Sequence, residues 1–189
     1  SYPDLAGFGR RFIDIDPGEL RDAVLYQLGA LDAFAQVAGT GIAYAKPHGA
    51  LYHACITHPA QAEAVAAATL EYDPSLAVLG APGSYLLVAV DGLGLEAVPE
   101  AFADRAYLPD GNLVPRAEVG AVITDPAIAA DRAVSLAIDR CVVANDATRI
   151  AVHARSICIH GDTSGAVAIA QAVRAALEAA SVGIHPFTG

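Results

Sequence analysis

The sequence predicts a parallel α/β fold. Short apolar segments typical of buried strands alternate with longer segments in which apolar residues recur at helical spacing. Strands that are apolar on both faces need helices on both sides of their sheet, which is the arrangement of parallel α/β proteins. With 189 residues, 54% of them hydrophobic, the chain is large enough to bury such a core in one domain.

The first predicted helix begins at residue 17. Asp16 can cap its first turn, Pro17 suits the first helical position, and Glu19 stands where a capping box has its acid. Apolar residues then repeat at helical spacing until Gly39 ends the run. Residues 41–45 form the first predicted strand, which leads into a polar loop.

The rest of the chain repeats this alternation. Further strands are expected at residues 76–80, 95–98 and 156–159. Helices are expected at residues 59–72, at 83–92, from 125 onward, and at 165–180. Between residues 100 and 124 the sequence is irregular, charged and rich in glycine and proline, so we expect a long loop there.

Charge and composition exclude two classes of protein. Eleven Lys and Arg residues against 21 Asp and Glu residues give a net charge of −10 without a basic cluster, which argues against nucleic-acid binding. No apolar run approaches the roughly 20 residues that a membrane helix needs. The three widely spaced cysteines indicate free thiols in a reducing compartment, and we therefore expect a cytoplasmic protein.

The loop after the first predicted strand carries Lys46 and His48. Pro47 restricts the backbone between a cation and an imidazole, and Gly49 would let a ligand approach the main chain. A lysine can neutralise a phosphate or a carboxylate, and a histidine can move a proton near neutral pH. The alternative is a surface lysine and a structural histidine beside an ordinary turn, and the local sequence leaves both open.

A second candidate segment follows the last predicted strand. His160 and Asp162 could form an oriented acid–base pair or contribute ligands to a metal. Alternatively, Asp162 or Thr163 could only cap the helix that follows. A single His-x-Asp pattern is a weak metal signal, so we predict no metal-ligating residues.

Charged residues in two further segments could bind substrate. Asp104 and Arg105 stand in the long loop, where they could either act on a ligand or bridge to each other and hold the loop. Arg10 and Arg11 follow a glycine-rich turn and could meet an anion, although a solvated basic pair is the simpler interpretation of these two residues alone.

Six segments, in this order, resemble the LamB/YcsF family. They are residues 2–11, 26–31, 46–52, 100–107, 110–113 and 159–162. The resemblance implies a distorted β/α barrel of the glycoside hydrolase/deacetylase type. Family members carry two further characteristic segments before the position of Ser1, so we expect residues 1–189 to form a single catalytic barrel domain that is incomplete at its N-terminus. We also expect an exposed apolar surface or an open sheet edge near residues 1–11.

The resemblance also implies a function. Family members serve as the A subunit of a 5-oxoprolinase, which works together with subunits B and C. This enzyme uses ATP and water to convert 5-oxo-L-proline to L-glutamate. On the same basis, a divalent metal such as Mg²⁺ could accompany the ATP, and the chain could form a homo-oligomer. On this basis the expected catalytic residues are Lys46, His48, His160 and Asp162. The expected substrate- or ATP-binding residues are Arg10, Arg11, Asp104 and Arg105.

Two other functions stay open at this point. One is a metal-dependent hydrolase of the deacetylase kind, with His48, His160 and Asp162 around a bound water. The other is a non-catalytic protein that scaffolds its partner subunits. The first predicts turnover without ATP, and the second predicts assembly that does not depend on these side chains.

Overall fold

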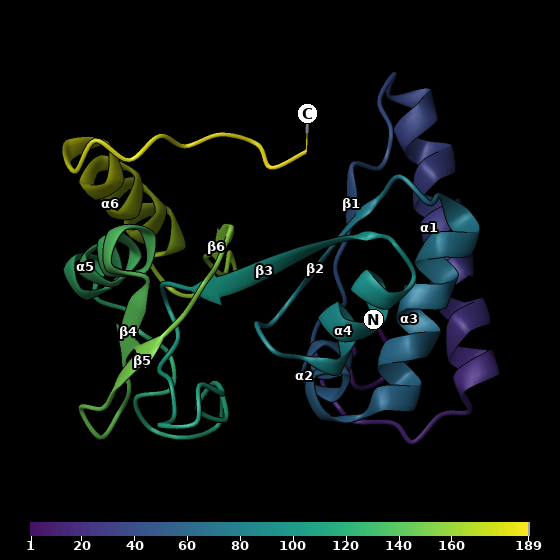
Figure 1. Cartoon of the computed structure of the whole chain (residues 1–189), viewed down its shortest axis with the longest axis horizontal. Helices are drawn as coiled ribbons and strands as arrows, with labels where there is room; N and C mark the ends of the chain where they lie inside the picture. Colours follow the sequence, from purple (N-terminus) through teal and green to yellow (C-terminus); the bar gives the residue numbers. More distant parts are fainter. Residues whose placement is uncertain (189) are drawn as a thin grey trace. The chain divides into compact units, whose positions relative to one another are not determined.

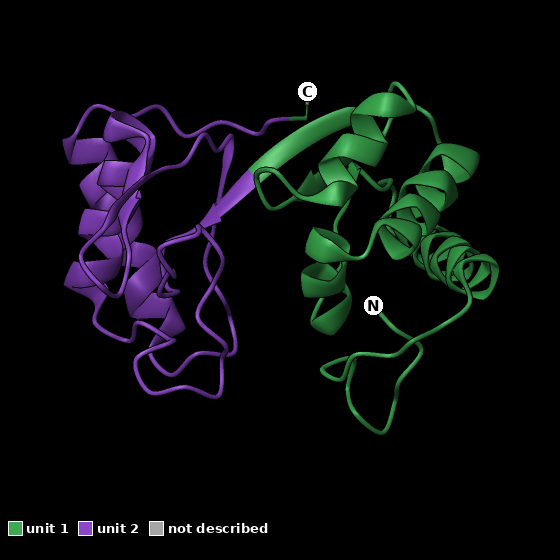
Figure 2. Ribbon diagram, turned by 60° about the horizontal axis from the view of Figure 1, so that its bottom comes forward, with its two compact units in different colours: residues 1–99, 188 green, residues 100–187, 189 purple. Residues whose placement is uncertain are grey.

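The computed structural model describes residues 1–188 and confirms an α/β fold with parallel strands. The chain divides into two units, which Figure 2 distinguishes by colour. The first comprises Ser1–Pro99 with Thr188, and the second comprises Glu100–Phe187. Whether both belong to one catalytic barrel domain stays a prediction.

The first unit contains three parallel strands. Strand β2 (Ala77–Gly80) lies between β1 (Tyr44–Ala45) and the first half of β3 (Glu96–Phe102). All four residues of β2 are buried, as expected of a strand that is covered on both faces. Only two residues of the apolar segment before the polar loop pair regularly, so this strand is shorter than predicted.

The helices of the first unit begin at the predicted signals. Helix α1 (Pro17–Val37) starts where the carboxylate of Asp16 accepts the backbone N–H groups of Gly18 and Glu19. Figure 1 shows α1 beside α3 (Pro59–Tyr72), and α3 in turn contacts α4 (Tyr85–Gly92). Their inward side chains, which include Leu20, Val65, Leu86 and Val90, form one core with Val78 of β2.

One helix of this unit is missing from the sequence-based prediction. Helix α2 (Ala50–Thr57) follows the polar loop directly and buries Leu51, Tyr52 and Cys55. It has only eight residues, and Gly49 precedes it without any side-chain cap. Neither its length nor its start therefore gave a signal that separates it from a loop.

The second unit joins the end of β3 to β6 (Ser156–Cys158), again in parallel. Helix α5 (Pro126–Val134) continues into a π-helical turn at Ser135–Asp139, and it packs beside α6 (Ala166–Ala179), as Figure 1 shows. A small antiparallel pair, β4 (Cys141–Val143) and β5 (Arg149–Ala151), was not predicted. Three residues are too few for the alternation of a strand to be recognised in sequence.

The N-terminal segment exposes apolar side chains, as expected. Leu5 is 98% exposed and Phe8 is 79% exposed. Exposed aromatic and aliphatic residues also lie along α1, at Tyr26, Phe34 and Val37. An apolar surface of this kind is typical of a region that another protein segment covers.

The three cysteines form no disulfide and differ in burial. Cys55 is 1% exposed, and burial raises the pKa of its thiol to about 12. Cys158, at the end of β6, is only partly buried.

We therefore expect a thiol reagent at about pH 8 to modify Cys158 in the folded protein long before Cys55. Mass spectrometry of the labelled peptides measures both rates; labelling of Cys55 as fast as in the unfolded chain would contradict this expectation.

Candidate functional site

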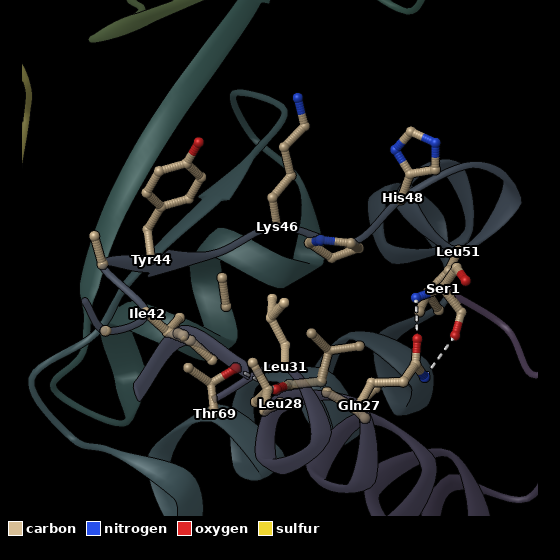
Figure 3. Close-up of a pocket in the computed structure, with 17 residues that line it drawn as sticks. Ser1, Gln27, Leu28, Leu31, Ile42, Tyr44, Lys46, His48, Leu51 and Thr69 are labelled. Atoms are coloured by element: carbon tan, nitrogen blue, oxygen red, sulfur yellow. Dashed lines mark hydrogen bonds between the residues drawn. The ribbon is translucent and has the colours of Figure 1, made fainter. Parts of the chain in front are cut away.

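The first group of candidate residues lies on the loop that follows β1. Lys46 is partly exposed, Pro47 is buried and His48 is exposed. The ammonium of Lys46 lies 5.7 Å from the centre of the Tyr52 ring on α2, a position in which the ring face attracts the cation. In Figure 3, Lys46 and His48 both extend away from Leu28 and Leu31 of α1. The loop thus presents a cation and an imidazole on the same side of the chain.

A cavity of about 630 Å³ lies beside this loop, between α1 and β1. Its walls are largely apolar, and Figure 3 shows Leu28, Leu31 and Ile42 among the side chains that form them. Polar side chains also line it, namely those of Ser1, Gln27, Tyr44, Lys46, His48 and Thr69. The charged end of the loop therefore borders a mostly apolar hollow.

Gly49 is required by the backbone and not by a ligand. Its φ of +64° lies in the left-handed region, and a Cβ atom placed on it would clash with the carbonyl oxygen of Gly9. The same oxygen accepts the N–H of Ala50 at 2.9 Å. The expectation that this glycine leaves room for a ligand is wrong: the backbone of the N-terminal segment fills the space and holds the loop in place.

We expect Gly49→Ala to destabilise the protein by about 2–5 kcal/mol, because the left-handed conformation and the clash with Gly9 both add to the cost. Gly83→Ala is the matched control. Gly83 has a similar φ of +74°, but a Cβ atom there would meet nothing within 4 Å, so only about 1–2 kcal/mol is expected. Urea unfolding of both variants measures the difference, and equal losses would show that the contact with Gly9 contributes nothing.

The two arginines of the N-terminal segment have different surroundings. Arg11 donates from Nε to the carboxylate of Asp4 at 3.0 Å, and Asp4 also accepts the N–H of Gly7. The hydrogen bond from Arg11 is the main reason why the pKa of Asp4 is lowered. Arg10 is exposed, with its guanidinium 5.7 Å from the centre of the Phe8 ring. Arg11 thus stabilises the turn, and of this pair Arg10 is the more accessible to an anion.

In the second unit, His160 is held by Asp104. Strands β3 and β6 are paired, and the N–H of Ala103 extends their pairing by donating to the carbonyl of Cys158 at 3.1 Å. Asp104 and His160 therefore follow the adjacent ends of two parallel strands. Nδ1 of His160 lies 2.9 Å from Oδ1 of Asp104, and the backbone N–H of His160 donates to Oδ2 at 2.7 Å.

Asp162 has a different partner from the one that the sequence suggested. Nη2 of Arg116 donates to its carboxylate at 3.0 Å, which is the main reason why the pKa of Asp162 is lowered. Both side chains of this ion pair are about half exposed. The carboxylate that bonds to the His160 imidazole is that of Asp104, whereas Asp162 pairs with Arg116.

Arg105 points into the protein and is 3% exposed. Its guanidinium donates to the carbonyl oxygens of Ala121, at 3.2 Å, and Val114, at 2.6 Å. Burial is the main reason why the pKa of Arg105 is lowered. Arg105 therefore fixes the long loop through its backbone, while Asp104 beside it bonds to His160, so the two do not bridge to each other.

Comparisons with known proteins agree with this architecture. The LamB/YcsF family pattern matches residues 1–189 of the chain. The chain belongs to the LamB/YcsF family. A relative from Mycobacterium avium (strain 104), named as the A subunit of 5-oxoprolinase, is 54% identical over 187 residues, which are 99% of this chain and 74% of that protein. A relative of the same name from Streptomyces griseus is 53% identical and matches over 99% of this chain and 75% of its own length.

A solved structure also resembles this LamB/YcsF chain. It is described as the lactam utilization protein from Thermus thermophilus, with a TM-score of 0.92 and 42% sequence identity. The match covers 99% of this chain and 74% of that protein. The resemblance that the six sequence segments indicated is therefore confirmed.

The candidate residues of this LamB/YcsF chain fall into two groups. Lys46, His48, Arg10 and Arg11 belong to the first unit, and the second unit holds Asp104, Arg105, His160 and Asp162. The expected catalytic residues are thus divided between the two units. Sequence reasoning missed Arg116, which stands in the irregular loop without any motif around it. It also missed Phe102, whose ring stacks on that of His160.

Two further features of residues 1–188 concern metals and membranes. Among these residues, no group of three or more His, Cys, Asp or Glu side chains is placed to hold a metal ion. None of the helices in this range has the length and apolar character needed to cross a membrane.

Proposed function

We propose that this chain is the A subunit of a 5-oxoprolinase and that, together with subunits B and C, it opens 5-oxo-L-proline to L-glutamate in a reaction that consumes ATP. A role in the 5-oxoprolinase system follows from the relatives named as the A subunit of that enzyme, which match almost the whole chain at more than half identity. This match is the observation that carries the proposal. The similarity to a lactam utilization protein supports it, because 5-oxoproline is a lactam.

The chemistry explains the need for ATP. The carbonyl carbon of a lactam is a poor electrophile, so water attacks it slowly. Transfer of the terminal phosphoryl group of ATP to the lactam oxygen releases ADP and makes this carbon reactive. Water then adds to the carbon, the ring nitrogen takes up a proton as its bond to the carbon breaks, and a second water releases phosphate from the resulting acyl phosphate.

This reaction needs positive charge around the phosphates and a group that moves protons. The donor set of the first unit fits a phosphate, because Lys46 is partly exposed and Arg10 is exposed. ATP supplies the phosphoryl group, and Lys46 would stabilise the charge that develops on the transferred group or on the lactam oxygen. His160 would move the proton to or from the attacking water or the ring nitrogen, and His48 could do the same.

We further propose that the chain works within a distorted β/α barrel of the glycoside hydrolase/deacetylase type, located in the cytoplasm. The parallel pairings of β1, β2, β3 and β6 are compatible with such a barrel. Cysteines that are not joined in disulfides suit a reducing compartment.

The test is an assay of glutamate release from 5-oxoproline by the full-length protein with subunits B and C, with and without ATP. We expect glutamate only when ATP and all three proteins are present, with ADP formed in equal amount. Turnover without ATP that a chelator abolishes would favour a metal-dependent hydrolase instead. Full activity after His48 and His160 are both replaced would favour a scaffold role.

A further inference from the structure

Asp104 is an unusual residue because its carboxylate is completely buried, with 0% of the side chain exposed. A charge removed from water is costly unless hydrogen bonds and an opposite dipole or charge compensate for it. In this protein most of the compensation comes from His160, which approaches the carboxylate with both its backbone N–H and its imidazole. The cost of burying Asp104 is thus offset by holding one histidine in a single orientation.

We propose that Asp104 is a positioning residue that holds the imidazole of His160 in the tautomer whose Nε2 accepts a proton. The inference rests on the proposed function, in which His160 moves a proton of the reaction. It changes the role that the sequence suggested for Asp104, from binding the substrate or ATP to acting through His160.

The tautomer follows from the chemistry of the carboxylate. Burial by itself would raise the pKa of Asp104, but the hydrogen bonds from the His160 side chain and backbone outweigh it and lower the pKa, so the group is ionised near neutral pH. An ionised carboxylate only accepts hydrogen bonds. The ring nitrogen that faces it, Nδ1, must therefore carry a hydrogen. A neutral imidazole has a single N–H, which leaves the lone pair on Nε2.

Packing fixes the orientation of the ring as well. The rings of Phe102 and His160 stack with their centres 5.6 Å apart and their planes at 19°. The N–H of Phe102 in turn donates to the hydroxyl of the buried Tyr107. The side chain of His160 remains 19% exposed, so solvent or a ligand can still reach part of the ring. The carboxylate of Asp104 and the aromatic face of Phe102 thus contact the imidazole on different sides. Contacts of this kind preorganise a group for proton transfer.

The tautomer can be measured directly by NMR of the full-length protein labelled with nitrogen-15 at histidine, above the usual titration range of imidazole. In the unsubstituted protein we expect the hydrogen of His160 on Nδ1. In Asp104→Asn the side-chain amide can donate to the ring, so the hydrogen is expected to move to Nε2. The matched control is Asp131→Asn, since Asp131 is an exposed aspartate of α5 in the same unit, and its spectrum at His160 is expected to match the unsubstituted protein.

Kinetics with subunits B and C complete the test. Asp104→Asn is expected to lower kcat about 10²-fold, with KM changed much less, because orientation of the proton-transfer group is lost and binding is not. Asp131→Asn is expected to retain the full rate. A hydrogen on Nε2 in the unsubstituted protein, or full turnover in folded Asp104→Asn, would overturn the proposal.

Two safeguards keep these outcomes distinct. If Asp104→Asn does not fold, the spectrum of the unsubstituted protein still decides the tautomer. If the unsubstituted protein with its partners releases no glutamate, the proposed function fails, while the spectrum tests the positioning of His160 by Asp104 independently of turnover.

Discussion

Replacement of Lys46 by alanine is expected to lower ATP-dependent glutamate formation about 10²-fold or more, which is the usual effect of removing one preorganised group that stabilises developing charge. Lys46 is the sole lysine among the 189 residues, so no other ammonium side chain of this protein can take its place. Two features hold the loop that carries Lys46: Pro47 is buried, and Gly49 contacts the backbone of Gly9. They limit the positions that the Lys46 side chain can reach. The rate at saturating 5-oxoproline and ATP, with subunits B and C present, is the measurement.

The control is Arg174→Ala, because it removes a positive charge from the exposed surface of α6. It is expected to retain the full rate, and circular dichroism verifies that both variants fold. If folded Lys46→Ala turned over like the unsubstituted protein, the loop after β1 would be structural and the role proposed for its cation would be wrong. A rise in KM alone, with kcat unchanged, would place Lys46 in ground-state binding only.

Replacement of His160 by glutamine is expected to lower kcat by about 10²–10⁴-fold, the range that proton transfer by a positioned side chain contributes. Glutamine keeps a polar side chain of similar reach but cannot exchange a proton near neutral pH. Loss of rate with little change in KM would therefore be assigned to proton transfer.

His153→Gln is the matched control for this variant, since His153 is an exposed histidine of the same unit. It is expected to leave kcat and KM unchanged. Retention of full activity by folded His160→Gln would remove the proton-transfer role of His160, together with the reason for its pairing with Asp104.

The sequence by itself determined the elements with strong local signals. Asp16 and Pro17 predicted the start of α1, and Pro59 predicted the start of α3, since capping and proline geometry act within a few residues. The four apolar residues of β2 predicted a strand buried on both faces. The positions of Lys46 and His48 after a strand, and of His160 after another, could also be predicted, because strand ends are visible in the chain.

Only the tertiary structure decided which candidate residues meet. Asp104 and His160 are 56 residues apart, and they come together because β3 and β6 pair in parallel, whereas Asp162, two residues from His160, bonds to Arg116. Likewise, Gly49 is required by the carbonyl of Gly9, 40 residues earlier in the chain. Local patterns predict helices, strands and turns because these form between near neighbours, but the partner of a buried charge or a close backbone contact is set by strand pairing and packing, which a single sequence does not reveal.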